Sequence, residues 1–360
     1  IHLTLGKAFR NLDQFAKGIT HCEASWRIRR EHLGEVDLAT LDAMIFTGAL
    51  LRENEQFTEG EKVAREALRL CRATYGDTHA ITIRAIESLS RHIGTQSFYH
   101  RVFAERPEEL ERYGLRNRDQ EAEKLINEGL RLAETISPPD ADRKLQFLRL
   151  RAKIMKRQGR LDEAEKALQE VLAISRREPA ELRHLIAILA ELASVHHAKK
   201  EWNEVERLYR EAIPFCEQFQ GDNSNNLAGL KGNLSAAIYN QDRFEEAHAF
   251  AVEAFDHFRQ QGAGQDIDVQ VAVDQLIRCN TQLAWRLSTA AKPEDRDPKR
   301  AVKLARQSTE LRPEDSDLWR WLLIAQVEAG EYEQAIKSFA EVEEFSEKKL
   351  YRHHLPLAVA

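Results

Sequence analysis

The chain has 360 residues, of which 42% are hydrophobic and 31% are charged, and its formal net charge is −6. A negative net charge gives no general attraction to nucleic acid or to an anionic membrane surface, so neither is expected as a partner. No apolar run approaches the roughly 18 residues needed to cross a bilayer, and the first residues lack the basic and apolar regions of a signal peptide. Only nine residues are proline, which leaves long stretches for helices. We therefore expect an all-α, cytoplasmic protein.

The residue types that carry catalysis or hold metals form no meaningful pattern. There is no glycine-rich phosphate loop after a strand, and no Ser/His/Asp or Cys/His set has an informative spacing. The cysteines form no C-x-x-C pair and are expected to be reduced thiols packed between helices. They are Cys22, Cys71, Cys216 and Cys279. We expect no metal, no cofactor and no enzymatic activity in this segment.

The chain begins inside a pattern that repeats further on. Gly6 and Phe9 occupy the positions that Gly48 and Leu51 occupy one period later. Because the first residue is not methionine and the first unit is short, we interpret the chain as a segment of a longer protein.

The clearest copy of the repeat lies at residues 158–174, where Leu161, Ala164, Leu168 and Val171 fall on one face of a predicted helix. Each copy has an aromatic residue or leucine, then a small residue, then two further apolar or small residues. The other copies are Phe57/Gly60/Ala64/Ala67, Trp202/Val205/Tyr209/Ala212, Phe244/Ala247/Ala251/Ala254, Tyr332/Ala335/Phe339/Val342 and, less clearly, Phe15/Gly18/Cys22/Ser25. The small residue recurs at intervals of 42, 42, 41 and 42 residues in the regular part of the chain. The sequence therefore predicts an array of helix pairs.

Three intervals depart from this period, and one of them is the 54 residues from Ala247 to Ala301, where the first helix is expected to run on through residues 279–291. The distance from Gly60 to Ala122 is 62 residues, and the surplus of about twenty predicts an insertion at residues 100–117, with a short extra helix. This insertion is either a functional lid or a tolerated loop. The distance from Ala301 to Ala335 shrinks to 34, which predicts a last pair of another subtype. Residues 346–360 are expected to be a frayed tail.

A period of 34 to 42 residues with two helices per unit resembles the tetratricopeptide repeat. The spacing near 42 and the link at residues 74–80, Thr-Tyr-Gly-Asp-Thr-His-Ala, resemble the kinesin-light-chain type of that repeat. The resemblance implies a right-handed superhelical solenoid of antiparallel helix pairs, about eight units long, whose first helices line the concave face. The expected segments are residues 1–99, 100–117, 118–279, 280–345 and 346–360.

The segment 280–345 is similar to the tetratricopeptide tail of many bacterial serine/threonine kinases and related multidomain proteins. It departs from that pattern at residues 319–321, Trp-Arg-Trp, where a smaller residue followed by Thr-Leu-Gly is usual. This similarity implies an alternative function, a non-catalytic regulatory or sensory segment of a larger bacterial signalling enzyme.

A basic stripe is predicted on the first helix of the fourth unit. Arg149, Lys153, Lys156 and Arg157 recur at i, i+4, i+7 and i+8, and Arg91 has a comparable position one unit earlier. Like charges at these spacings repel one another, so either a ligand anion or acidic neighbouring helices should offset them. The alternatives are therefore a binding site and a solvated charged face compensated by Glu163, Glu165 and other acids.

The equivalent positions of the next two units carry uncharged hydrogen-bonding residues, namely His197, Asn233, Tyr239 and Asn240. Amide side chains can bind an extended peptide backbone. Residues 233–237, Asn-Leu-Ser-Ala-Ala, resemble the Asn-Leu-Ala segment of kinesin-light-chain repeats, and the resemblance implies that Asn233 contacts a peptide. We therefore expect a scaffold that binds an extended, acidic peptide or a partner domain on its concave face.

Overall fold

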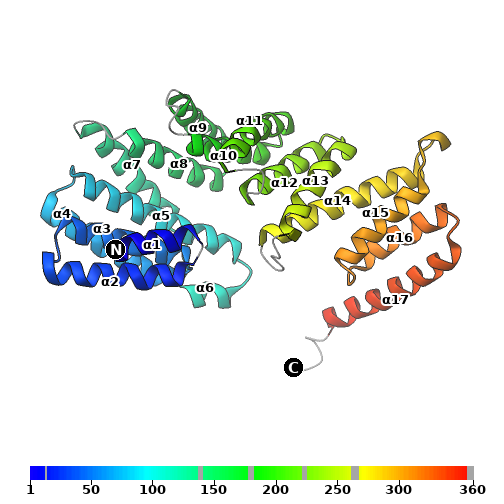
Figure 1. Ribbon diagram of the computed structural model, residues 1–360, viewed down its shortest axis with the longest axis horizontal. Coiled ribbons are helices and arrows are strands. Elements are labelled where there is room, and N and C mark those ends of the chain that lie inside the picture. Colours follow the sequence, from blue (N-terminus) through cyan, green and yellow to red (C-terminus); the bar gives the residue numbers. More distant parts are fainter. Residues whose placement is uncertain (13, 137–140, 177–181, 221–224, 261–266, 355–360) are drawn as a thin grey trace. The chain divides into compact units, whose positions relative to one another are not determined.

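A computed structural model describes residues 1–12, 14–136, 141–176, 182–220, 225–260 and 267–354, and within these ranges the chain forms helices and turns but no strand (Figure 1). It divides into two compact units, Ile1–Arg177 and Glu178–Ala360. The first unit contains α1 His2–Asn11, α2 Phe15–Leu33, α3 Leu38–Glu53, α4 Phe57–Tyr75, α5 Ala80–Val102, α6 Pro107–Tyr113, α7 Asp119–Thr135, α8 Ala141–Arg157 and α9 Leu161–Ser175. The second contains α10 Leu182–Lys199, α11 Trp202–Gln220, α12 Asn225–Tyr239, α13 Phe244–Gln260, α14 Ile267–Thr289, α15 Pro298–Leu311, α16 Ser316–Glu328 and α17 Tyr332–His354, with a short 3-10 helix at Pro293–Asp295.

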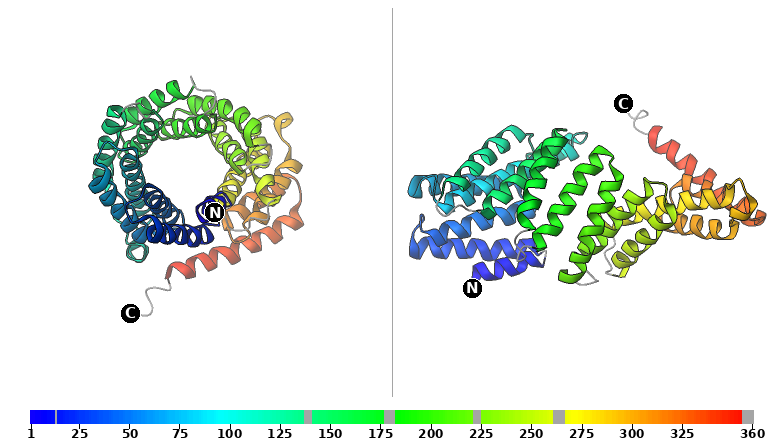
Figure 2. Two further views of the ribbon diagram at one scale, coloured as in Figure 1. Left: turned by 60° about the vertical axis from the view of Figure 1, so that its left-hand side comes forward. Right: turned by 90° about the horizontal axis from the view of Figure 1, so that it is seen from above.

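In the described part of the chain, the long helices form eight consecutive pairs, which are stacked in two layers within each unit (Figure 2). The first helix of one pair also contacts the first helix of the next, as in α3–α5, α5–α8, α12–α14 and α14–α16. Among the described residues, the second helix of one pair does not contact the second helix of the next pair extensively. Neighbouring helices approach most closely on the inside of a curved array, so the first helices form the inner layer of each unit. The all-α solenoid predicted from the sequence is confirmed.

The small residues that set the period lie where helices cross. Ala164 and Ala247 are completely buried in the second helices α9 and α13. Gly129 on α7 leaves room for the ring of Phe147 on α8, since a Cβ atom at Gly129 would lie 2.1 Å from the Phe147 Cζ atom. Close packing of two helices therefore requires a small residue at each crossing.

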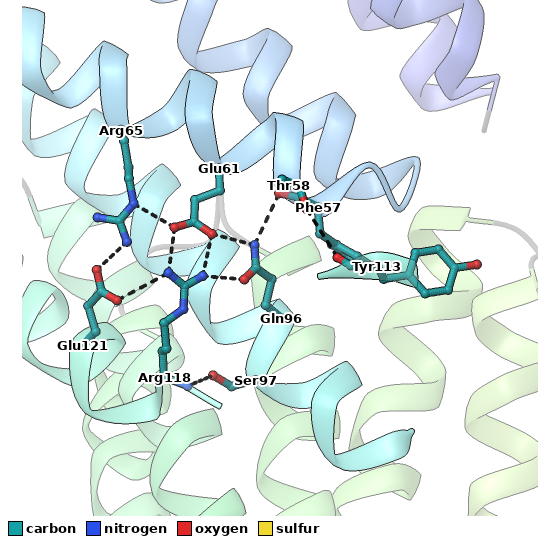
Figure 3. A network of polar contacts seen from close by, with 9 residues as sticks. All are labelled: Phe57, Thr58, Glu61, Arg65, Gln96, Ser97, Tyr113, Arg118 and Glu121. Atoms are coloured by element: carbon teal, nitrogen blue, oxygen red, sulfur yellow. Dashed lines mark hydrogen bonds and ion pairs between the residues drawn. The ribbon is translucent and has the colours of Figure 1, made fainter. Parts of the chain in front are cut away.

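A polar cluster joins α4, α5 and the start of α7 (Figure 3). The Glu61 carboxylate accepts hydrogen bonds from Gln96 at 2.8 Å, from both ends of the Arg118 guanidinium at 2.7 and 2.5 Å, and from Arg65 at 2.7 Å. The Gln96 amide also donates to the carbonyl oxygen of Phe57 at 3.3 Å. We call the three side chains Glu61, Gln96 and Arg118 a Glu–Gln–Arg clamp, because they tie a second helix to the next pair.

The clamp occurs at two further junctions, and in all three copies the glutamine follows the glutamate by 35 residues. The Gln–Glu and Arg–Glu distances are 3.5 and 2.9 Å in the second copy and 2.8 and 2.7 Å in the third. These copies are Glu123/Gln158/Arg160 and Glu206/Gln241/Arg243. The arginine follows the glutamate by 37 residues in both, but by 57 residues in the first copy. The insertion thus lies between the glutamine and the arginine of one clamp and leaves the clamp intact.

The insertion contains the short helix α6, and aromatic stacking fixes it to the array. The Phe103 ring lies 5.9 Å from the Tyr99 ring and 6.2 Å from the Tyr113 ring, centroid to centroid. The Tyr99 ring also lies 5.0 Å from the ring of Phe57, which is only 2% exposed. The extra residues therefore cover the start of α4.

The C-terminal helix is longer than the sequence pattern predicted. We expected a tail from residue 346 onward, but α17 continues to His354. The physical reason is that residues 346–354 contain neither glycine nor proline, so nothing interrupts a helix already started. The rest of the expected tail, residues 355–360, lies outside the described residues. None of the described helices is both long enough and apolar enough to span a membrane.

Candidate functional site

The predicted basic residues of the first unit lie on the inner helices α5 and α8, among many ion pairs. Arg91 donates to the Glu87 carboxylate on its own helix at 2.7 Å and to the Gln146 amide oxygen on α8 at 3.1 Å. Arg143 on α8 also pairs with Glu87. Similar pairs join α3 to its neighbours, where Asp42 accepts from α5 and Glu53 from α1. Acids of adjacent inner helices therefore neutralise much of the positive charge on this face.

Arg157 is part of the packing between helices. Its guanidinium donates to the Asp119 carboxylate at 2.7 Å, and the two side chains are only 14% and 6% exposed. Asp119 accepts a second hydrogen bond, at 3.1 Å, from Arg101. Removing Asp119 would leave the buried Arg157 guanidinium without this carboxylate partner, which is costly for a buried charge. The burial and the ion pair of Arg157 indicate that this residue stabilises the packing of α8 against α7.

Arg149, Lys153 and Lys156 form the rest of the predicted stripe on α8. Lys153 is exposed, whereas Arg149 and Lys156 are half-buried. Arg149 donates weakly to the Gln146 amide oxygen, at 3.5 Å. Glu163, which was considered as a compensating acid, instead accepts two hydrogen bonds from Arg160, both at 2.7 Å.

The predicted residues of the second unit lie on α10, on α12 and just beyond it. His197 is exposed, and its ring lies 5.0 Å from the Trp202 ring in an edge-on arrangement. Asn233 is exposed on α12, and Asn240 directly follows that helix and donates to the Ala236 carbonyl oxygen at 2.7 Å. Gly229, Asn233, Ala236 and Asn240 recur at i, i+4, i+7 and i+11, so α12 presents one stripe of small and amide residues. No atom except those of adjacent residues and the helix backbone lies within 4 Å of a Cβ built at Gly229, so this stripe borders open space.

Sequence reasoning missed Arg278, which lies on α14 next to this stripe. Its guanidinium carbon lies 4.6 Å from the centroid of the half-buried Tyr239 ring, a cation–π contact between α14 and α12. It donates to the Gln275 amide oxygen at 3.4 Å, but no carboxylate lies within ion-pair distance of it among the described residues. Most described arginines of the inner helices pair with an acid, whereas Arg278, like Arg286 on the same helix, instead lies over an aromatic ring.

A tryptophan pair was also missed. Trp285 on α14 and Trp321 on α16 lie 5.5 Å apart, edge to face, and Trp285 is 41% exposed. Trp285 and Trp321 are 36 residues apart, whereas Trp319 lies one 34-residue period after Trp285, so the repeat spacing alone did not identify this pair. Together Asn233, Arg278 and the tryptophan pair form what we call the inner surface of the second unit.

A pocket of about 680 Å³ lies in the first unit, beside the first clamp. Several of its lining charges already pair with one another, because Arg118 pairs with Glu121, and Arg101 with Asp119. The pocket is therefore a weaker candidate site for a charged ligand than the surface around Arg278.

Consecutive antiparallel helix pairs, a nearly constant period and a layer of touching first helices define a helical repeat protein. A family model described as tetratricopeptide repeat matches residues 40–81 and 151–178. The chain thus carries tetratricopeptide repeats, as the sequence pattern predicted. No curated protein matches the sequence.

Two solved structures show the same fold, and a third is similar in part. The apo form of RapI matches with a TM-score of 0.60 at 10% identity, covering 86% of this chain and 77% of that one. The apo form of the quorum sensor NprR from B. thuringiensis matches with a TM-score of 0.54 at 12% identity, covering 96% and 86%. Kinesin-light-chain repeats from Podosopora anserina match with a TM-score of 0.46 at 16% identity, covering 62% and 97%. The similarity of residues 280–345 to kinase tails stays a prediction.

Proposed function

We propose that this protein is a non-catalytic scaffold that binds an extended, acidic peptide segment of a partner protein along its inner helices. Helical repeat arrays bind partners on the extended surface that their stacked units create. RapI and NprR, which share the fold, are both described in apo form, and NprR is described as a quorum sensor. We infer that ligand binding by such an array is also the function of this chain.

The observation that carries the proposal is Arg278 beside the amide stripe of α12. An extended peptide needs hydrogen-bonding partners for its backbone, and Asn233 and Asn240 can both donate and accept. The guanidinium of Arg278 is held by the Tyr239 ring, and a carboxylate is the planar acceptor that fits its donors. The second unit thus combines backbone recognition with a selective contact to an acidic side chain.

In the first unit, Arg149, Lys153 and Lys156 supply a second positive region that would attract the same kind of partner. Charges at the rim of a binding surface act mainly on the association rate and are sensitive to salt. The Trp285–Trp321 pair would add apolar contact area for a neighbouring side chain.

The proposal can be tested with a labelled peptide in which Glu alternates with Leu, and with versions that carry Gln or Lys at every Glu. Fluorescence anisotropy should give the order Glu above Gln above Lys in affinity. Arg278→Glu should weaken binding of the Glu peptide about tenfold or more, since a charged hydrogen bond contributes about 1.5–3 kcal/mol.

The matched control is Arg320→Glu on α16, because Arg320 already pairs with Asp317 on its own helix at 2.5 Å. This variant should change the affinity less than Arg278→Glu. A parallel double variant, Arg149→Glu with Lys153→Glu, tests the stripe of the first unit. Equal affinity for the three peptides would contradict the acidic specificity, and an unchanged affinity in both the Arg278 and the double variant would contradict the binding surface.

A further inference from the structure

Two arginines of α14 are held over aromatic rings of the preceding helix pair. The guanidinium carbon of Arg278 lies 4.6 Å from the centroid of the Tyr239 ring, at the end of α12. The guanidinium carbon of Arg286 lies 4.2 Å from the centroid of the Phe244 ring, at the start of α13. The two rings lie 5.0 Å apart, edge to face. One aromatic pair therefore holds two guanidinium groups in the same part of the second unit.

Arg286 lines a pocket of about 800 Å³ between the start of α13 and the end of α14. Two acids that also line this pocket are paired with other arginines, Glu245 with Arg300 and Glu246 with Arg243. Arg286 is exposed, and among the described residues no carboxylate lies within ion-pair distance of it. Its planar fork of donors suits a carboxylate that enters the pocket.

The pocket also limits how much negative charge a ligand can bring. Asp242 and Asp295 line it as well, and like charges brought together at an interface repel one another. A continuous run of acidic residues would therefore meet repulsion here, whereas a single carboxylate placed at Arg286 would gain its hydrogen bonds. The pocket thus favours one well-placed acid over many.

The positions of the two arginines define a spacing. Arg278 and Arg286 are eight residues apart, which corresponds to about 12 Å along α14 at roughly 1.5 Å per residue. The cation–ring and ring–ring distances limit the separation of the two guanidinium groups to a similar length. In an extended peptide, residues i and i+4 lie on the same side and about 13 Å apart. Acidic side chains four residues apart therefore match the two arginines.

The amide stripe of α12 runs beside this pair of arginines. The helices α12 and α14 are successive first helices and contact each other in the second unit (Figure 1). Asn233 and Asn240 are seven residues apart, which corresponds to roughly 10 Å along α12. A peptide lying along both helices can thus place its backbone on the amides and its acidic side chains on Arg278 and Arg286.

We propose that the second unit selects a peptide segment in which two acidic residues stand four positions apart, one bound by Arg278 and the other by Arg286. This inference rests on the proposed function, the binding of an extended acidic peptide, and it adds the specificity of that site. The spacing of the acids, rather than their number, determines the affinity. Arg286 is accordingly a specificity-determining residue.

The test uses labelled peptides of equal length that each contain two Glu residues, separated by two, four or six positions in an otherwise neutral sequence. Fluorescence anisotropy with the full parent chain should show that the peptide with four-residue spacing binds about tenfold more tightly than the other two, because it alone gains a second charged hydrogen bond. Arg286→Gln should remove this advantage and bring all three peptides to the affinity of a peptide with one Glu. The spacing series on the parent chain does not depend on any variant being folded.

The matched control is Arg259→Gln, because Arg259 also lies over a ring, that of Phe255 at 5.9 Å, but belongs to the second helix α13 and pairs there with Asp256. This variant loses the same charge and should keep the preference for four-residue spacing. Equal affinity for the three spacings would overturn this inference and leave the binding of acidic peptides intact, as would a preference that survives Arg286→Gln with an unchanged helical circular-dichroism signal. If no acidic peptide binds the parent chain, the proposed function itself is wrong.

Discussion

The first Glu–Gln–Arg clamp makes a pH-dependent contribution to stability that a single substitution should remove. Burial alone would raise the pKa of Glu61, but hydrogen bonds from Arg118, Arg65 and Gln96 outweigh it and lower the pKa to about 2. The folded state thus holds the proton less tightly than the unfolded state, whose pKa is near the ordinary value of 4.5. The stabilisation is fully present above pH 4.5 and is lost as the pH falls from there toward 2.

A pKa difference of this size corresponds to about 3 kcal/mol at 1.36 kcal/mol per pKa unit. Solvent reaches part of the cluster, since the Arg65 side chain is 44% exposed, and we expect screening to reduce the effect to about 1–2 kcal/mol. Glu61→Gln should therefore lower the free energy of unfolding by that amount at pH 7. Urea denaturation from pH 7 to pH 3 should show the gap between parent and variant closing below pH 4.5.

The matched control is Glu66→Gln, because Glu66 lies on the same helix and, among the residues described, pairs with the neighbouring Arg69 alone, at the surface. It should change the unfolding free energy by a few tenths of a kcal/mol at most. A gap between parent and Glu61→Gln that stays constant down to pH 3 would show that the carboxylate is not stabilised by its arginine partners.

Three further predictions concern the packing of the first unit. Gly129→Ala should destabilise the chain by about 1–3 kcal/mol in urea denaturation through overlap with the Phe147 ring, and Phe147→Leu in the same chain should recover part of the loss. His92 is completely buried, and burial together with the charge of a nearby arginine lowers its pKa to about 3. The parent should therefore lose stability as the pH falls from 6.5 toward 3, and His92→Leu should lose less over that range in pH-dependent melting. Deletion of residues 98–117 with Ser97→Gly should give a folded chain with the clamp intact, and circular dichroism should show the loss of little more than α6 and the end of α5.

The period and the helix pairs could be predicted from the sequence because they depend on local patterns. A small residue such as Ala164 or Ala247 is required wherever two helices cross, and these crossings recur with each unit. The turn at Gly159 has a φ of +78°, a conformation that favours glycine, so it too was visible in the sequence. These features need no knowledge of residues far away in the chain.

Local sequence patterns could not predict which partner each charged side chain has in the fold. Arg157 and Asp119 are 38 residues apart, so helical spacing alone gives no sign that they form a buried pair. Arg278 was missed for a related reason, because its position depends on the aromatic ring of another helix, which helical spacing does not show. The clamp was predictable in principle, since a Gln-x-Arg triplet follows a glutamate at a fixed distance in two of its three copies.

The insertion shows how an array can accept extra chain without losing its register. In the two regular clamps one residue separates the glutamine from the arginine, whereas 21 residues separate Gln96 from Arg118. Loop-closure entropy grows slowly with length, at about 0.6 kcal/mol per doubling, so the longer connection costs about 2–3 kcal/mol. The stacked rings of Tyr99, Phe103 and Tyr113 can offset this cost, since each aromatic pair contributes about 0.5–1.5 kcal/mol beyond its buried area. The insertion is therefore close to neutral for stability, and it needs no ligand-binding function to explain why the array tolerates it.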